Sequence, residues 1–214
     1  MSDKVMDVYV YISELPEGYS TQNYVNLAVG EYLKLPNETQ LDKKNVSEET
    51  LLLKRTPAGK PYFPNCKDIG LSVSHSGKYI VCALAKGNIG VDIEQTKKFE
   101  DESNEMFSER LCKIADRFFH QTEAEYIKID PITRFYEVFT AKESYVKLKG
   151  TGFDETLGEI SVLPNNVSMP SCHKQTGSVS WRSDDASFWQ TLIGSDYTLC
   201  VCTYNDSCPK IFWI

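Results

Sequence analysis

Short apolar runs separated by polar turns occupy most of the N-terminal part of the chain and predict strands. Residues 5–12 and 79–85 are mainly apolar, and residues 71–77 alternate apolar side chains with serines before a polar turn. Successive side chains of a strand point to opposite faces, so this alternation indicates a strand with two unlike faces. Residues 21–33 instead place apolar side chains at helical spacing. This part of the chain is therefore expected to combine strands with one helix.

The stretch 89–94 reads apolar, glycine, apolar, acid, apolar, acid. In a strand, Asp92 and Glu94 would share one face, while Val91 and Ile93 would point towards a core. Two carboxylates on one face repel each other unless water or a cation compensates, and a hard cation such as Mg²⁺ binds oxygen ligands of this kind. The plain alternative is an edge strand that carries two solvated acids.

The dipeptide Gly87-Asn88 lies directly before this acidic stretch. It fits a two-residue hairpin turn, which requires positive φ angles. Residues 69–94 are therefore predicted to form an antiparallel meander. His75 would lie at the end of a strand, where it can face the same site as the acids.

A long helix is predicted over about residues 131–149. Asp130-Pro131 suits the start of a helix, and Gly150 suits its end. The apolar stripe of this helix runs into a charged pair, Lys142 and Glu143, where an apolar side chain is expected. The stripe consists of Ile132, Phe135, Phe139 and Val146.

Glu143 must meet a cation or a wet cleft, because burying an unpaired carboxylate is costly. Lys147 follows one turn later and places positive charge beside it. The alternative is an ordinary surface pair worth a few tenths of a kcal/mol. The position of Glu143 on the apolar stripe favours the cleft.

Further elements are predicted with weaker signals. Apolar residues 111, 114, 115 and 118 mark a helix that follows a loop over 95–106, and Thr122–Glu125 forms a capping box for a short helix. Residues 34–49 read as a polar connection, and 51–55 as a short strand. Later strands are predicted over 158–163, 178–181 and 197–204, with loops over 164–176 and 205–210.

Composition indicates an ordinary globular chain of 214 residues, with 41% hydrophobic and 25% charged residues. The N-terminus lacks a secretion signal and no run of about 18 apolar residues occurs, so a soluble cytoplasmic protein is expected. The net charge of −7 argues against general affinity for nucleic acid or anionic membranes. Two local basic clusters can still bind an anion: Arg55 with Lys60, and Lys142, Lys147 and Lys149.

Five short motifs occur in a specific order, and together they carry a family resemblance. They are Gly59-Lys60-Pro61, Ser74-His75-Ser76, Gly90-Val91-Asp92-Ile93-Glu94, Phe118-Phe119-x-x-x-Glu123 and Lys142-Glu143-Ser144-x-x-Lys147. This order and spacing resembles the 4′-phosphopantetheinyl transferase superfamily, in its surfactin-synthetase-activating (Sfp-like) branch. The resemblance covers residues 55–152 well and the C-terminal sheet loosely.

The resemblance implies an α+β fold of two similar halves related by a pseudo-twofold axis. Each half would be an antiparallel sheet packed on helices, with the boundary near Gly87-Asn88, so that residues 1–88 and 89–214 form the halves of a monomer. It also implies a Mg²⁺-dependent reaction, with Mn²⁺ as a substitute, at the interface of the halves. The reaction moves 4′-phosphopantetheine from coenzyme A to a serine of an acyl or peptidyl carrier protein and releases adenosine 3′,5′-bisphosphate.

Individual roles also follow from the resemblance. Asp92, Glu94 and Glu143 match metal ligands, and Glu143 also matches the general base. Lys147 matches a residue at the pyrophosphate, so the catalytic set is Glu143, Lys147 and Asp92. The predicted coenzyme A contacts are Lys60, Ser74, His75 and Lys147, with Arg55 and Lys142 added from the basic clusters.

The chain departs from the family pattern at one position and in one segment. Phe139 stands where the helix motif usually has Trp, which is a tolerable aromatic exchange. Residues 5–33 contain no Lys or Arg, whereas relatives often carry a basic segment there for the 3′-phosphate. Either Arg55, Lys60 and His75 grip that phosphate, or its recognition is weak.

The carrier partner is expected to be acidic and to dock on the helix near residues 110–118. Arg110, Lys113 and Arg117 would attract it, and Leu111 would supply an apolar contact. A plain solvated helix face is the alternative.

Two other function classes compete with transfer. One is a binding module that holds coenzyme A or a carrier without catalysis, and the other is a Mg²⁺-dependent phosphodiester hydrolase. The hydrolase would break down coenzyme A without a carrier. The sequence does not specify the carrier or its pathway, so fatty-acid, polyketide, nonribosomal-peptide and lysine-pathway carriers all stay open.

Overall fold

The computed structural model describes residues 6–15, 18, 20–35, 51–152, 158–164, 177–183 and 185–214. The predicted connection over 34–49 lies almost entirely outside these residues. The elements, in chain order, are β1 (Met6–Glu14), α1 (Thr21–Lys34), β2 (Lys54–Arg55), β3 (Pro61–Tyr62), β4 (Ile69–Ser76), β5 (Tyr79–Lys86), β6 (Gly90–Gln95), α2 (Asn104–Phe118), α3 (Gln121–Ile127), α4 (Pro131–Lys149), β7 (Ser178–Ser183), β8 (Ala186–Ile193), β9 (Tyr197–Thr203) and β10 (Ser207–Trp213).

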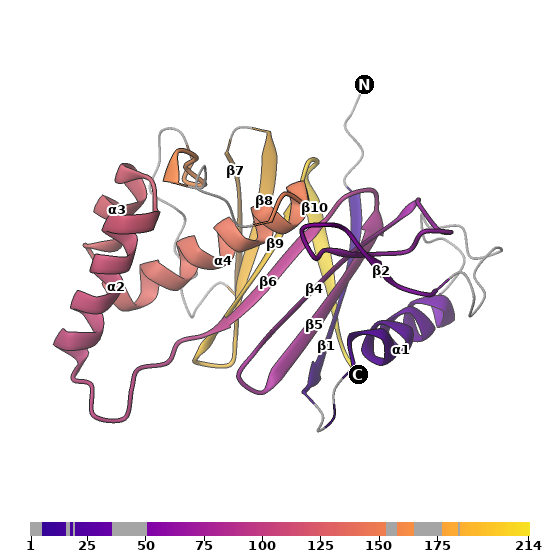
Figure 1. Ribbon diagram of the computed structural model, residues 1–214, viewed down its shortest axis with the longest axis horizontal. Helices are drawn as coiled ribbons and strands as arrows, with labels where there is room; N and C mark the ends of the chain where they lie inside the picture. Colours follow the sequence, from indigo (N-terminus) through magenta and orange to yellow (C-terminus); the bar gives the residue numbers. More distant parts are fainter. Residues whose placement is uncertain are drawn as a thin grey trace.

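Two four-stranded sheets form the centre of the molecule, with helices on their outer sides (Figure 1). The first sheet has the strand order β10-β1-β5-β4, and α1 covers it. The second has the order β6-β9-β8-β7, and α2, α3 and α4 lie on its side. A small ladder of β2 with β3 lies beside β4. The α+β class is therefore as predicted. The first sheet is not purely antiparallel as predicted, because β10 pairs with β1 in parallel.

Strand alternation explains why the sheets pack against each other and against helices. Val8, Val10 and Ile12 of β1 point into a core shared with Val91 and Ile93 of β6. The intervening side chains of β1 point to α1 instead. Each fully buried aliphatic side chain of this kind contributes roughly 1.5–3 kcal/mol. The inward direction predicted for Val91 and Ile93 is confirmed.

The predicted meander over residues 69–94 is wrong at its last strand. β4 and β5 form an antiparallel hairpin, but β6 pairs with β9 in the second sheet. The chain passes closely over Gly70 as it leaves β5, since a Cβ built there would lie 1.6 Å from the Gly87 carbonyl oxygen. This crossing carries the chain to the other sheet, so Gly87-Asn88 does not form the turn of a two-residue hairpin.

The C-terminal part also differs from expectation. Residues 158–163 are not a strand, and 186–193 form the unpredicted β8. Most of the expected loop over 205–210 belongs to β10, which pairs along most of the length of β1. β10 lies beyond the predicted division at residue 88, yet it completes the first sheet.

The helix α4 has the predicted bounds, and Gly150 ends it with a left-handed φ of 71°. α2 begins at Asn104, inside the expected loop. α3 is capped by His120 and Glu123, so the capping box predicted at Thr122 starts two residues too late. None of the described helices is long and apolar enough to cross a membrane.

Candidate active site

The two sheets meet where β4 and β6 lie side by side, and serine side chains join these edge strands. We call Ser72, Ser74 and Ser76 the serine seam. Because they alternate along β4, all three point the same way, and their partners advance in the same direction along β6. The hydrogen bonds run from Val91 N to Ser72 Oγ (3.0 Å), from Ser74 Oγ to Asp92 Oδ1 (2.7 Å), from Ser76 Oγ to Glu94 Oε2 (2.7 Å) and from Gln95 N to Ser76 Oγ (3.1 Å).

Gly90 allows α4 to pack directly on β6. A Cβ at this position would lie 1.8 Å from the carbonyl oxygen of Ser144 and 2.7 Å from the amide nitrogen of Leu148. Both atoms belong to the backbone of α4. The close approach places Glu143 and Lys147 of the helix near the acidic face of β6.

Lys147 connects the helix to the seam. Its Nζ donates to Asp92 Oδ1 at 2.6 Å and to Ser74 Oγ at 2.9 Å. Asp92 is only 2% exposed, so an uncompensated charge would be costly there. The ammonium group and the serine hydroxyl together compensate the charge of one carboxylate oxygen.

The three predicted metal ligands all have raised pKa values. Burial raises the pKa of Asp92, Glu94 and Glu143, and the charge of Asp92 adds to the shift of the other two. The pKa of Glu94 reaches about 7. Lys147 opposes the shift at each of them. Carboxyls with raised pKa values around one lysine are typical of sites that exchange protons or bind cations.

The carboxylates fit a cation in part. Asp92 Oδ2 is buried and has no hydrogen-bond partner within the described ranges, so one hard oxygen ligand is open. Among all the residues that the structure describes, no three His, Cys, Asp or Glu side chains are close enough to one another to ligate a metal ion. The chemistry of the donors suits Mg²⁺, whereas the positions in the structure do not form a ready-made cage.

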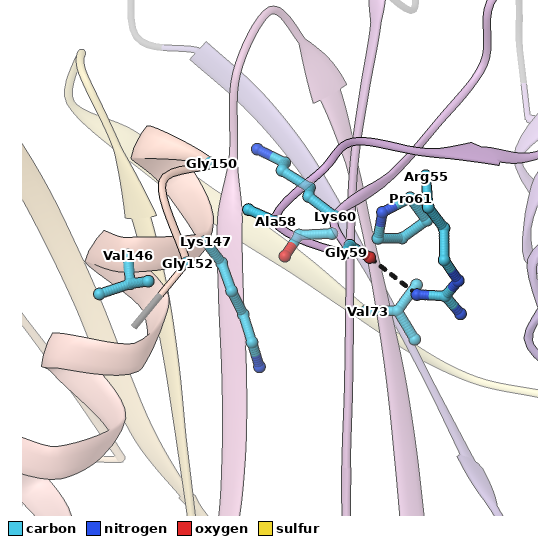
Figure 2. A pocket seen from close by; sticks show the side chains of 11 residues that line it. Arg55, Ala58, Gly59, Lys60, Pro61, Val73, Val146, Lys147, Gly150 and Gly152 are labelled. Carbon is cyan, nitrogen blue, oxygen red and sulfur yellow. Dashed lines mark hydrogen bonds between the residues drawn. The ribbon is translucent and has the colours of Figure 1, made fainter. Parts of the chain in front are cut away.

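Lys147 also lines a cavity of about 190 Å³ (Figure 2). Arg55, Lys60 and Lys147 line it from three different segments, and none of the described lining residues is acidic. Gly59 also lines the cavity, and Arg55 donates to its carbonyl oxygen at 2.8 Å (Figure 2). The wall therefore carries three basic side chains, and an excess of positive charge in a cavity wall favours an anion.

Lys60 is held rigidly in this wall. Its Nζ donates to the carbonyl oxygens of Ile89 (3.1 Å) and Leu148 (3.4 Å), so it ties the Gly59 turn to the start of β6 and to the last turn of α4. Burial lowers the pKa of Lys60 to about 8. The structure thus brings together Arg55, Lys60 and Lys147 as predicted, with Ser74 hydrogen-bonded to Lys147 beside them.

Three predicted coenzyme A contacts do not line this cavity: Ser74, which lies beside it, His75 and Lys142. Lys142 is 1% exposed and pairs with Glu123 at 2.7 Å, and its Nζ also donates to the Ile160 carbonyl oxygen. The ion pair directs Lys142 into the interior between α3 and α4, so the expected anion contact is corrected to a buried structural role. His75 is exposed on β4, on the strand face opposite to that of the serine seam.

Sequence reasoning gave no role to Ser72, to Gly90 as a contact of α4, or to the hydroxyl of Ser76. A signal for the serines was present, because three serines at every second position of a strand must share one face. The contact of Gly90 with α4 had no local signal, since its partner lies more than fifty residues away.

The predicted docking helix carries a groove between basic and apolar side chains. Arg110 is held by Glu102 through bonds of 2.8 and 2.9 Å, whereas Arg117 lies on the open face. Leu111 is 1% exposed and belongs to the core, so the expected apolar contact is wrong at this residue. The described residues that line the groove are Glu102, Met106, Glu109, Arg110, Lys113, Ile114, Arg117 and Phe118.

Comparison with protein families finds a match that reaches from β6 into β9. Residues 88–202 match the model of the 4′-phosphopantetheinyl transferase superfamily. The matched residues make up more than half of the 214 residues. The chain belongs to the 4′-phosphopantetheinyl transferase superfamily. Its enzyme class is that of these transferases.

Curated 4′-phosphopantetheinyl transferases are similar over different lengths. The chain is 27% identical to Sfp of Bacillus subtilis over 82% of this chain and 71% of that protein. It is 31% identical to gsp of Aneurinibacillus migulanus over 50% of this chain and 42% of the relative. An L-aminoadipate-semialdehyde dehydrogenase-phosphopantetheinyl transferase of Xenopus laevis is 29% identical over 63% and 48%. The similarity thus includes the Sfp-like branch, and in two of the three pairs it spans less than half of the relative.

The matched region supplies one part of the site, and the chain that precedes it supplies the other. The matched region contains β6 and α4, which carry the acids and Lys147. The Gly59-Lys60-Pro61 and Ser74-His75-Ser76 motifs precede it in sequence, and they meet it at the cavity and along the serine seam. Four of the five motifs therefore converge on one region. The fifth motif supplies Glu123, which pairs with Lys142 inside the helical core.

Proposed function

We propose that the protein transfers 4′-phosphopantetheine from coenzyme A to a serine hydroxyl of an acyl or peptidyl carrier protein and releases adenosine 3′,5′-bisphosphate. One observation carries the proposal: Lys147 lines the cationic cavity and also contacts Asp92 at 2.6 Å. An anion-binding volume and a cluster of carboxylates therefore share one wall. Phosphoryl transfer requires this combination, because charge develops on phosphate oxygens while a proton leaves the nucleophile.

The proposed step assigns separate tasks to Glu143 and Lys147. The carrier serine oxygen forms a bond to the β-phosphorus, and the bond from that phosphorus to the bridging oxygen breaks. The serine proton passes to the carboxylate of Glu143, whose pKa is raised by burial and by Asp92. A base with a pKa nearer to neutral is well suited to this task. The bridging oxygen leaves on the bisphosphate, and Lys147 stabilises its charge.

Asp92, Glu94 and Glu143 are the proposed ligands of Mg²⁺, and Mn²⁺ is a candidate substitute. A bound ion would draw charge from the phosphate oxygens and reduce their repulsion from the three acids. The open Asp92 Oδ2 supports this assignment. Without a cation, the acids would repel the pyrophosphate, so transfer is expected to stop in EDTA.

Recognition of the 3′-phosphate is proposed to depend on Arg55 and Lys60. They are the two cations of the cavity wall that do not pair with an acid among the described residues. Comparing kcat/KM for coenzyme A with that for 3′-dephospho-coenzyme A tests this role. A large preference for coenzyme A that disappears in Arg55→Met supports the grip, whereas comparable values for the two substrates indicate weak recognition.

The groove of α2 is the proposed contact for an acidic carrier. Lys113 and Arg117 are exposed, and Met106 replaces Leu111 as the apolar contact because it is 59% exposed. Reversing the charges of Lys113 and Arg117 should raise KM for the carrier and leave KM for coenzyme A unchanged. Lys34→Glu on α1 is the matched control, since it reverses an exposed charge on the opposite side of the molecule. An unchanged carrier KM would reject the docking surface.

Consumption of coenzyme A with and without carrier protein tests the proposed function against its alternatives. A transferase consumes coenzyme A only when an apo carrier is present. A hydrolase would release phosphopantetheine without a carrier, and a binding module would consume none in either case.

The proposal includes the predicted halves 1–88 and 89–214, a cytoplasmic location and a monomeric state. Light scattering tests the monomeric state.

A further inference from the structure

Ser76 makes two hydrogen bonds that together fix the direction of its hydroxyl proton. Its Oγ accepts from the backbone N–H of Gln95 at 3.1 Å and lies 2.7 Å from Glu94 Oε2. An ionised carboxylate only accepts hydrogen bonds, so the single hydroxyl proton of Ser76 points to Glu94. Ser74 Oγ likewise donates to Asp92 Oδ1, and it accepts a hydrogen bond from Lys147 Nζ. Each acid on β6 thus has its own serine donor on β4.

Glu94 depends on this donor more than Asp92 does. Asp92 is also held by Lys147, whereas Ser76 supplies the only hydrogen bond to the Glu94 side chain among the described residues. A glutamate side chain has three rotatable bonds, and Glu94 is only half-buried. A charge-assisted hydrogen bond from a fixed hydroxyl selects one of its orientations and occupies one oxygen.

We propose that Ser76 is a positioning residue that holds Glu94 towards Asp92 and Glu143, with Oε1 of Glu94 left open for a divalent cation. The inference rests on the proposed function and adds to it a residue for which no role was predicted. It explains the position of Ser76 at the end of the seam, beside the last acid of β6. Groups that orient a metal ligand commonly affect affinity for the ion as strongly as they affect activity.

Ser72 separates this role from general stability of the seam. Its Oγ accepts from Val91 N at 3.0 Å, and its hydrogen bonds in the structure include none to a carboxylate among the described residues. Ser72→Ala therefore weakens the junction of the two sheets without removing a donor to an acid. Ser76→Ala removes the donor, and Ser76→Thr keeps a hydroxyl at the same position.

The test is calorimetric titration of Mn²⁺ into the protein with coenzyme A but no carrier, so that no transfer occurs. Ser76→Ala should weaken Mn²⁺ binding by roughly tenfold or more. Ser76→Thr should restore most of the affinity, and Ser72→Ala should keep it while lowering Tm. In parallel carrier assays, kcat should fall in Ser76→Ala while KM for coenzyme A stays constant.

Wild-type Mn²⁺ affinity in Ser76→Ala would overturn the assignment. An equal loss of affinity in Ser72→Ala would also overturn it, because loosening of the seam would then explain both. Absence of transfer by the wild-type protein on every carrier, with Mn²⁺ binding and its Ser76 dependence intact, would reject the proposed function and leave the positioning role standing.

Discussion

Replacing Gly90 with alanine should disable the site through a backbone displacement. The new Cβ would lie 1.8 Å from the Ser144 carbonyl oxygen, whereas ordinary contacts begin at 3.4 Å. The difference between these distances is about 1.6 Å, and neither backbone can yield it by a side-chain rotation. α4 must therefore move away from β6 and carry Lys147 with it.

The magnitude of the effect follows from the contact that is lost. Lys147 Nζ lies 2.6 Å from Asp92 Oδ1, and a shift of α4 by more than about 1 Å would lengthen this contact beyond hydrogen-bond range. A 1 Å misplacement can cost about 100-fold in rate, so kcat/KM should fall by roughly that factor or more. Overpacking of this kind typically lowers the free energy of unfolding by about 1–3 kcal/mol, which leaves most of the protein folded.

Two measurements test the Gly90→Ala prediction: carrier modification kinetics, and chemical unfolding monitored by circular dichroism. Gly30→Ala is the matched control, because Gly30 lies inside α1 and a Cβ added there would meet nothing within 4 Å. That change should raise stability by about 0.5–1 kcal/mol and leave transfer unaffected. Wild-type turnover in Gly90→Ala would refute the reasoning that close packing of α4 on β6 aligns the site.

Three further predictions concern charged groups. Glu143→Gln should bind coenzyme A in calorimetry but lose about 100- to 10,000-fold in transfer rate, since it cannot accept the serine proton, and near-normal turnover would remove it from the mechanism. Burial raises the pKa of Glu94 from the ordinary 4.5 to about 7, so the folded protein favours the protonated carboxyl. The contribution of Glu94 to the free energy of unfolding is therefore complete below pH 4.5 and is lost as the pH rises through 7. In EDTA, the fall in Tm between about pH 5 and pH 8 should therefore be smaller in Glu94→Gln than in the wild type, and an equal fall would contradict the shift. Lys142→Met should lower the free energy of unfolding by about 3–5 kcal/mol, because it leaves Glu123 buried without its cation, and a change below about 1 kcal/mol in urea unfolding would show that the pair is not needed.

Local signals were enough to predict the parts of the site that depend on one element. Pro131 and Gly150 mark the ends of α4 because their backbone preferences act within one helical turn. Asp92 and Glu94 share a face because strands alternate. These signals do not depend on the rest of the fold, and the structure agrees with them.

Pairing between distant segments was not predictable in the same way. Gly87-Asn88 looks like a hairpin turn, but β6 finds its partner in β9, about a hundred residues later. β10 was not predicted because it contains Pro209. The proline is tolerated because β10 is an edge strand, and among the described strands it pairs with β1 alone. Lys142 and Lys147 look alike in the sequence, and only the position of Glu123 on α3 decides which lysine is buried.

The central claim is that the acids of β6 and α4, together with the cationic cavity, transfer phosphopantetheine to a carrier. The most direct test is the intact mass of several apo carrier proteins after incubation with this protein, coenzyme A and Mg²⁺, with an EDTA control. The account predicts a gain of roughly 340 Da, the mass of one phosphopantetheine group, on at least one carrier and none in EDTA. No gain on any carrier, with coenzyme A binding intact, would contradict the claim and favour a binding module.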